Sequence, residues 1–90
     1  MDMKEAVKVA KDYIQQLLVD EKISDLGLEE IEQNPRSGTW NITLGFSRPW
    51  DSRNNIALLG GAAPRRTYWT LQVRESDGEV LSVRIRETAN

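Results

Sequence analysis

The hydrophobic residues at the start of the chain recur every three or four positions. Over residues 4–22 this spacing, which includes Ala10 and Ile14, places the apolar side chains on one face and most charged side chains on the other. Asp2 and Glu5 match the capping box, in which two side chains three residues apart satisfy early backbone N–H groups. We therefore predict an amphipathic helix over about residues 4–22 that covers one face of a sheet.

After this segment, hydrophobic and polar residues alternate in the pattern of β-strands. The alternation predicts four strands, at about residues 27–33, 39–46, 67–75 and 79–87. The first is the weakest, because Leu28 and Ile31 are an odd number of residues apart and share a face only if a bulge intervenes. The turn residues Asn34-Pro35-Arg36-Ser37-Gly38 separate it from the second strand.

The order of these elements predicts an α+β fold, in which one N-terminal helix packs on a four-stranded antiparallel meander sheet. Ninety residues are enough for a single domain, so we expect residues 1–90 to share one core. The expected dry face of the sheet consists of Trp40, Ile42, Leu44, Phe46, Trp69, Leu71, Val73, Leu81, Val83 and Ile85.

Two turns compete at the last hairpin. A two-residue Asp77-Gly78 turn would place apolar residues opposite polar ones, whereas directly paired residues point to the same face. A three-residue loop that begins at Ser76, with Gly78 in the left-handed region, restores the match. This second register pairs Val73 with Leu81, Leu71 with Val83 and Trp69 with Ile85, and we predict it because it buries more apolar surface.

The ending DGEVLSVRI, residues 77–85, resembles the final hairpin of PepSY-type domains, in which a turn with Asp and Gly precedes an acidic residue and Val-Leu-x-Val. The order of helix and strands is similar to that family and, more loosely, to the cystatin-type helix on a curved sheet. The resemblance implies a non-catalytic binding or peptidase-inhibiting module. The chain departs from the PepSY pattern in its long connection at residues 47–66.

Several classes of chemistry are excluded by composition. The chain contains no cysteine and no histidine, so thiolate nucleophiles, imidazole bases and ordinary Cys/His zinc sites have no ligands here. We predict that the protein is not an enzyme and holds no cofactor or metal. The acidic residues Asp25, Glu29, Glu30 and Glu32 lack the spacing of a calcium loop, and we interpret them as edge-strand charge.

The longest run without charge, residues 54–64, is far shorter than the roughly 20 apolar residues of a membrane-spanning helix. The first residues alternate charged and apolar side chains, unlike a secretory signal. We therefore expect no membrane association and a cytoplasmic location.

The connection at residues 47–66 is longer than most loops of compact domains, and such loops are usually functional or disordered. From Ser47 to Trp69, four arginines and one aspartate give a charge of +3. Because the net charge of the whole chain is −2, the remaining residues sum to −5. Arginine and tryptophan are enriched at interaction hot spots. The candidate partner-binding residues of this connection are Arg48, Trp50, Arg53, Arg65 and Arg66.

A second candidate surface is the outer face of the sheet, where the predicted register places Thr70 opposite Arg84 and Tyr68 opposite Arg86. Together with the loop, these residues predict a non-enzymatic binding or regulatory module that recognises a protein partner through residues 47–68 and the outer sheet face. The acidic net charge argues against nucleic acid.

Three alternatives remain open. The connection at residues 47–66 could be a lid over a pocket in a small-ligand-binding or enzymatic subunit. An exposed sheet edge could support a homodimer. The loop could also be structural, with Trp50 folded over an open end of the core and the guanidinium of Arg48 or Arg53 stacked on it.

Overall fold

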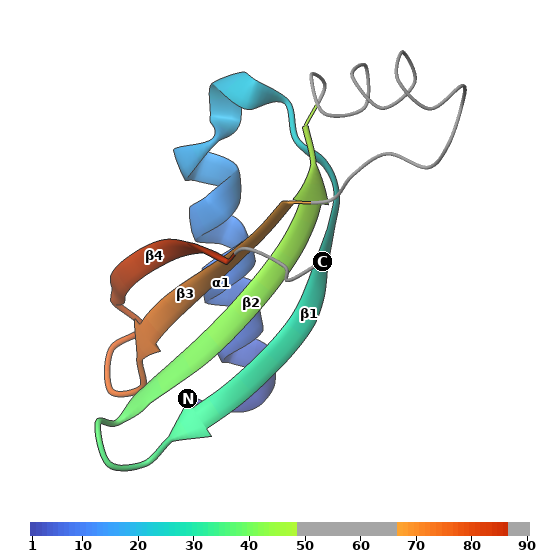
Figure 1. The fold of residues 1–90 in the computed structure, drawn as a ribbon. Coiled ribbons are helices and arrows are strands. Elements are labelled where there is room, and N and C mark those ends of the chain that lie inside the picture. The colour runs from blue at the N-terminus through green and yellow to red at the C-terminus, as the bar shows by residue number, and fades with distance from the viewer. Residues whose placement is uncertain (49–66, 87–90) are drawn as a thin grey trace.

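The computed structural model describes residues 1–48 and 67–86, which form one helix, one short 3₁₀ turn and four strands (Figure 1). The elements follow in the order α1 (Met3–Leu17), η1 (Val19–Glu21), β1 (Ser24–Asn34), β2 (Thr39–Ser47), β3 (Thr67–Arg74) and β4 (Val80–Arg86). The strands form one sheet in the order β1-β2-β3-β4, and each pair of neighbours is antiparallel. The predicted α+β fold with a four-stranded meander is confirmed.

Helix α1 begins where the sequence predicts. The backbone N–H of Glu5 donates to Asp2 Oδ1 at 2.8 Å, and the Glu5 side chain accepts from the Asp2 N–H, which completes the capping box. The α-helix ends at Leu17 rather than near residue 22, because the chain tightens into η1 and then reverses at Lys22, whose φ is 52°.

The face of α1 that packs on the sheet is narrow and made of small or β-branched residues. Ala6, Ala10 and Ile14 have no exposed surface, so the helix backbone lies close to the strands. Leu17, which follows the same apolar spacing, is instead 51% exposed because it lies beside this face. The helix therefore buries about one residue per turn.

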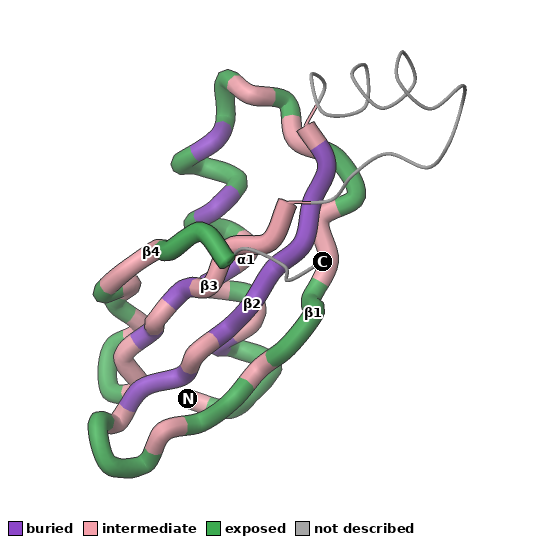
Figure 2. The backbone as a smooth tube through the Cα atoms, viewed as in Figure 1, coloured by how far each residue is buried: buried purple, intermediate pink, exposed green. Residues whose placement is uncertain are grey.

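Strand β2 is the centre of the core, with strands on both sides and α1 across one face (Figures 1 and 2). Its inward residues Ile42, Leu44 and Phe46 are fully buried, as are Leu71 and Val73 of β3. This agrees with the predicted dry face for the two central strands.

Strand β1 contains the bulge on which its prediction depended. Leu28 pairs with Leu44 and Ile31 pairs with Ile42, and the register shifts between Leu28 and Glu30. Glu29 is thus the extra residue that brings both apolar side chains to the face of α1.

In the β3–β4 hairpin, Trp69 pairs with Ile85 and Leu71 with Val83, as predicted. The register differs from the prediction only near the turn. The pairing of Val73 with Leu81 is wrong, because Val73 pairs with Val80. The Arg74 N–H donates to the Glu79 carbonyl at 2.8 Å, so the loop has four residues, not three. An extra residue at Leu81 forms a bulge that restores the register.

Two further residues were wrongly assigned to the core. Leu81 is 41% exposed and Ile85 is 68% exposed, although both were predicted to be inward. The reason is the position of β4 at the edge of the sheet, whereas α1 packs on β1, β2 and β3. On this edge strand an inward direction gives only partial burial, as it does for Val80 and Val83, which pack against the border of the core.

Candidate functional site

The face of the sheet opposite α1, which we call the outer face, is polar across all four strands. Its centre consists of Asn41, Thr43, Thr70, Gln72 and Ser82, which pair with one another across β2, β3 and β4. The Thr43 and Thr70 hydroxyls lie 2.9 Å apart in a hydrogen bond. Within the described residues no helix covers this face (Figure 1).

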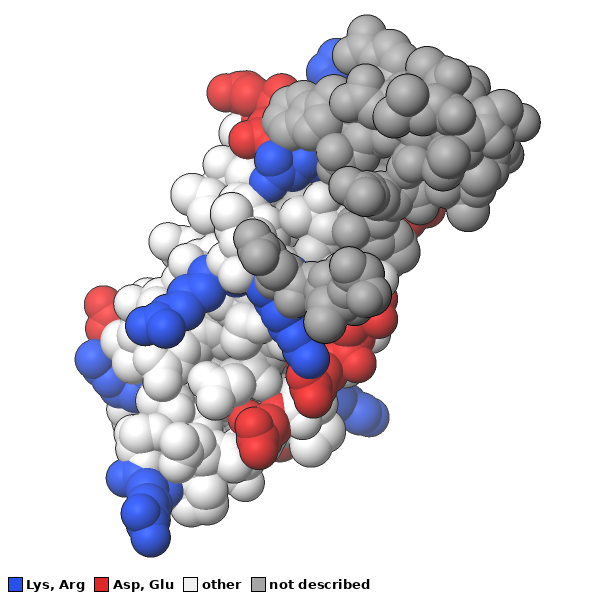
Figure 3. Space-filling model, in the orientation of Figure 1, with Lys and Arg blue, Asp and Glu red and all other residues white. Residues whose placement is uncertain are grey.

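Opposite charges border the outer face on its two edge strands. The pairing of the strands places Glu30 of β1 beside Thr43 of β2, and Arg84 of β4 beside Thr70 of β3. The acidic side thus comes from one end of the chain and the basic side from the other. Figure 3, which looks onto this face, shows acidic and basic side chains with uncharged ones between them.

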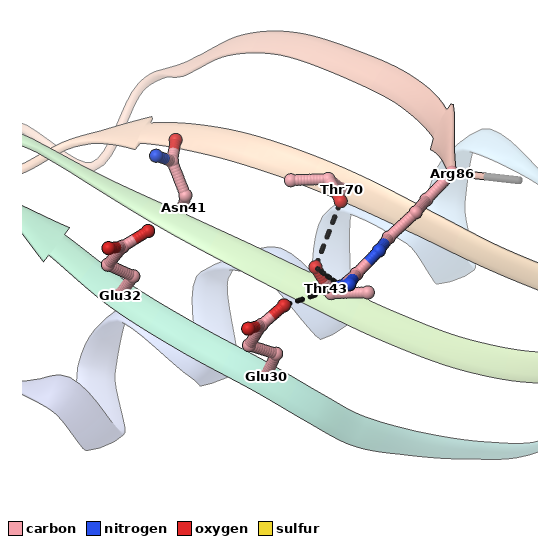
Figure 4. Close-up of a pocket in the computed structure, with 6 residues that line it drawn as sticks. All are labelled: Glu30, Glu32, Asn41, Thr43, Thr70 and Arg86. Carbon is pink, nitrogen blue, oxygen red and sulfur yellow. Dashed lines mark hydrogen bonds and ion pairs between the residues drawn. The ribbon is translucent and has the colours of Figure 1, made fainter. Parts of the chain in front are cut away.

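The two charged borders touch at one point. Arg86 Nη1 donates to Glu30 Oε1 and lies 3.5 Å from Thr43 Oγ1 (Figure 4). The side chains of Arg86 and Glu30 are 51% and 58% exposed, and ion pairs at such exposure typically contribute about 0–1 kcal/mol. The pair can therefore open at small cost when another charge approaches.

Two open hollows lie side by side on the outer face. One has a volume of about 250 Å³ and is lined by Glu30, Glu32, Asn41, Thr43, Thr70 and Arg86. The other has a volume of about 310 Å³ and is lined by Asn41, Thr70, Gln72, Ser82 and Arg84. Because they share Asn41 and Thr70, they form one shallow depression from the acidic side to the basic side.

Three predicted site residues lie on the outer face. Arg84 pairs with Thr70 and Arg86 with Tyr68, as the predicted register requires. Tyr68 is half-buried and lies opposite Gly45 on β2. Sequence reasoning did not place Glu30 on this same face, although the bulge that turns Ile31 inward also turns its neighbours outward.

Arg48 lies elsewhere, at the end of the core. Its guanidinium carbon is 5.1 Å from the Trp69 ring centre and 5.7 Å from the Phe46 ring centre, and Nη1 lies 3.6 Å from Glu21 Oε1. The side chain is 17% exposed, so Arg48 covers the two rings in a cation–π arrangement. Trp50, Arg53, Arg65 and Arg66 lie outside the described residues.

The β3–β4 turn carries a separate charge cluster. Arg74 Nη1 donates to Asp77 Oδ2 at 3.0 Å and to Glu79 Oε2 at 2.7 Å. The Glu79 N–H donates to Asp77 Oδ1 at 3.0 Å. This backbone hydrogen bond, followed by the bond and charge of Arg74, lowers the pKa of Asp77 below the usual value of an aspartate.

The lowered pKa of Asp77 predicts a specific acid sensitivity. Because its folded-state pKa lies below the unfolded value of about 3.9, its contribution is present above about pH 4 and is lost as the pH falls through the folded value. Asp77→Asn is expected to reduce stability near neutral pH and to lose less stability on acidification. Urea unfolding at a series of pH values measures this, and parallel profiles for the two proteins would contradict it.

Residues 1–48 and 67–86 hold no cluster of three or more acidic residues arranged to bind a metal ion. Among the same residues, no helix has the length and hydrophobicity needed to cross a membrane. No protein-family model matches the chain, and neither does any curated protein or solved structure.

Proposed function

We propose that this protein is a non-enzymatic binding or regulatory module that recognises a protein partner through the outer face and the adjoining 47–68 loop. The observation that carries the proposal is the shape and charge of the outer face. Two joined hollows lie between Glu30 and Glu32 on one side and Arg84 and Arg86 on the other. Charge arranged in this way favours a partner that carries both signs in a matching order.

The charged residues at the borders of the outer face can exchange their ion pair with each other for ion pairs with a binding partner. The side chains of Arg86 and Glu30 are about half exposed, so their ion pair contributes little free energy. A partner can therefore replace it with two ion pairs, one to each side chain, without leaving a buried charge unpaired. A partner would place a basic group near Glu30 and Glu32 and an acidic group near Arg84. The uncharged centre, with Thr70 and Asn41, offers hydrogen bonds to an extended segment.

The proposed contribution of the loop rests on the sequence. Its arginines and Trp50 are residue types that often dominate binding energy, and Tyr68 lies where the loop joins β3. The resemblance of residues 77–85 to PepSY-type domains also favours a non-catalytic role. We propose a cytoplasmic location on the sequence expectation alone.

The test is affinity capture from a lysate of the source organism, with quantitative mass spectrometry of the bound proteins. Arg84→Glu is expected to reduce capture of a specific partner on the order of tenfold, because it reverses the charge of the basic border. A variant with residues 49–66 replaced by a Gly/Ser linker is expected to reduce it as well.

Arg36→Glu is the matched control, because it makes the same change of charge at an exposed arginine of the β1–β2 turn. It is expected to capture the partner as the native protein does. If all four baits capture the same proteins in the same amounts, the outer face and the loop are not the binding surface.

A further inference from the structure

The described sheet has two free edges, at β1 and at β4. A free edge presents unpaired backbone N–H and C=O groups that can pair with another strand. The two edges differ in how well they can do so.

The edge at β1 is poorly suited to pairing. Its register against β2 shifts twice, between Ser24 and Gly27 and between Leu28 and Glu30. Asp25 has a positive φ of 56°, which bends the strand further. Acidic side chains project from the same strand, and charge of one sign discourages a second copy of the edge.

The edge at β4 is regular from Ser82 to Arg86, where every residue follows the ladder with β3. It also carries apolar side chains that the described residues leave exposed. Ile85 is 68% exposed and Leu81 is 41% exposed, and both belong to the apolar set of their strand. Large exposed side chains on a free, regular edge are a common feature of strand-pairing surfaces.

The polarity of β4 is symmetric about Val83. Residues 81–85 read apolar, polar, apolar, polar, apolar in either direction. In an antiparallel pair centred on Val83, each Val83 faces the other, Ile85 faces Leu81 of the second copy, and Arg84 faces Ser82 of the second copy. Within residues 81–85 each apolar residue then meets an apolar residue, and no two like charges are directly opposed.

Other registers are worse on the same criteria. Centring the pair on Arg84 would place two guanidinium groups directly opposite each other, which is destabilising. Shifting the register by one residue would place apolar side chains opposite polar ones. In the Val83 register Arg86 faces Val80 of the second copy, so the match of polarity extends over residues 81–85.

We propose that two copies of this chain form a two-fold symmetric dimer by antiparallel pairing of their β4 strands about Val83. The dimer contains one eight-stranded sheet, with both helices on one face and the two outer faces continuous on the other. A two-fold contact of this kind closes on itself and does not lead to fibres. The proposal is independent of the function proposed above.

Sedimentation velocity over a range of concentrations tests the association. The native protein is expected to sediment with twice its 10.3 kDa monomer mass. Ile85→Lys is expected to raise the dimer Kd on the order of tenfold or more, because it places a charged side chain opposite the apolar Leu81 of the second copy. Val19→Lys is the matched control, since Val19 is 67% exposed but lies in η1, and it is expected to leave the Kd unchanged.

A monomeric native protein at all concentrations would overturn the proposal, as would an Ile85→Lys variant that dimerises as the native protein does. Thermal unfolding by circular dichroism confirms that both variants fold.

Disulfide trapping tests the register, because the chain has no cysteine of its own. Directly opposed residues of an antiparallel pair have Cα atoms about 4.5–5.5 Å apart, which suits a disulfide. Val83→Cys is therefore expected to form a covalent dimer on mild oxidation, and Ile85→Cys, which lies four positions from its own copy, is expected not to. Equal or faster crosslinking of Ile85→Cys would overturn the Val83 register.

Discussion

Phe46→Ala is expected to lower the free energy of unfolding by about 3–5 kcal/mol. Phe46 is fully buried near the end of β2, and its ring meets that of Trp69 edge-on, with centres 5.7 Å apart. The substitution removes this aromatic contact and the ring beneath Arg48, and it leaves a cavity. Since domains of this kind are stable by about 5–15 kcal/mol, the loss is a large fraction of the total.

Urea unfolding followed by far-ultraviolet circular dichroism measures the effect of Phe46→Ala. Phe46→Leu is the control, because it loses the ring but keeps most of the buried volume, and it is expected to cost about 1–2 kcal/mol. A cost below about 1 kcal/mol for Phe46→Ala would mean that this end of the core is not packed as described.

Ile14→Ala is expected to lower the free energy of unfolding by about 2–5 kcal/mol. Ile14 has no exposed surface and is the largest of the fully buried residues of α1. Alanine has the higher helix propensity, by a few tenths of a kcal/mol, so the loss measures packing of the helix on the sheet rather than helix formation.

Leu17→Ala is the matched control for Ile14→Ala. Both residues lie on α1 and follow the apolar spacing, but Leu17 is 51% exposed. It is expected to cost less than about 1 kcal/mol by the same urea measurement. Equal costs for the two variants would contradict the position of α1 on the sheet.

Much of the fold was predictable because its signals are local. Alternation with a period of two identified the strands, and the Asn34–Gly38 and Asp77–Gly78 turn residues placed the hairpins. The register of Leu71 with Val83 followed from matching apolar residues to one face. Gly78, with φ of +74°, has the left-handed conformation that the turn prediction requires.

The candidate site was predictable only in part. Pairing alone placed Arg84 and Arg86 on the outer face. The contact of Arg86 with Glu30 joins residues at opposite edges of the sheet, and no local pattern indicates it. Arg48 was predicted as a binding residue, and its position over Trp69 depends on how the end of β2 meets the core.

By itself, the sequence determined which residues form strands and which side of each strand is apolar. It also excluded chemistry that requires cysteine or histidine, since the chain has neither. Only the tertiary structure decided which inward residues are covered. Ile85 and Leu71 share the same apolar pattern, yet one is exposed and the other buried, because α1 packs on β1, β2 and β3. Periodicity determines the direction of a side chain, whereas burial depends on what lies in that direction.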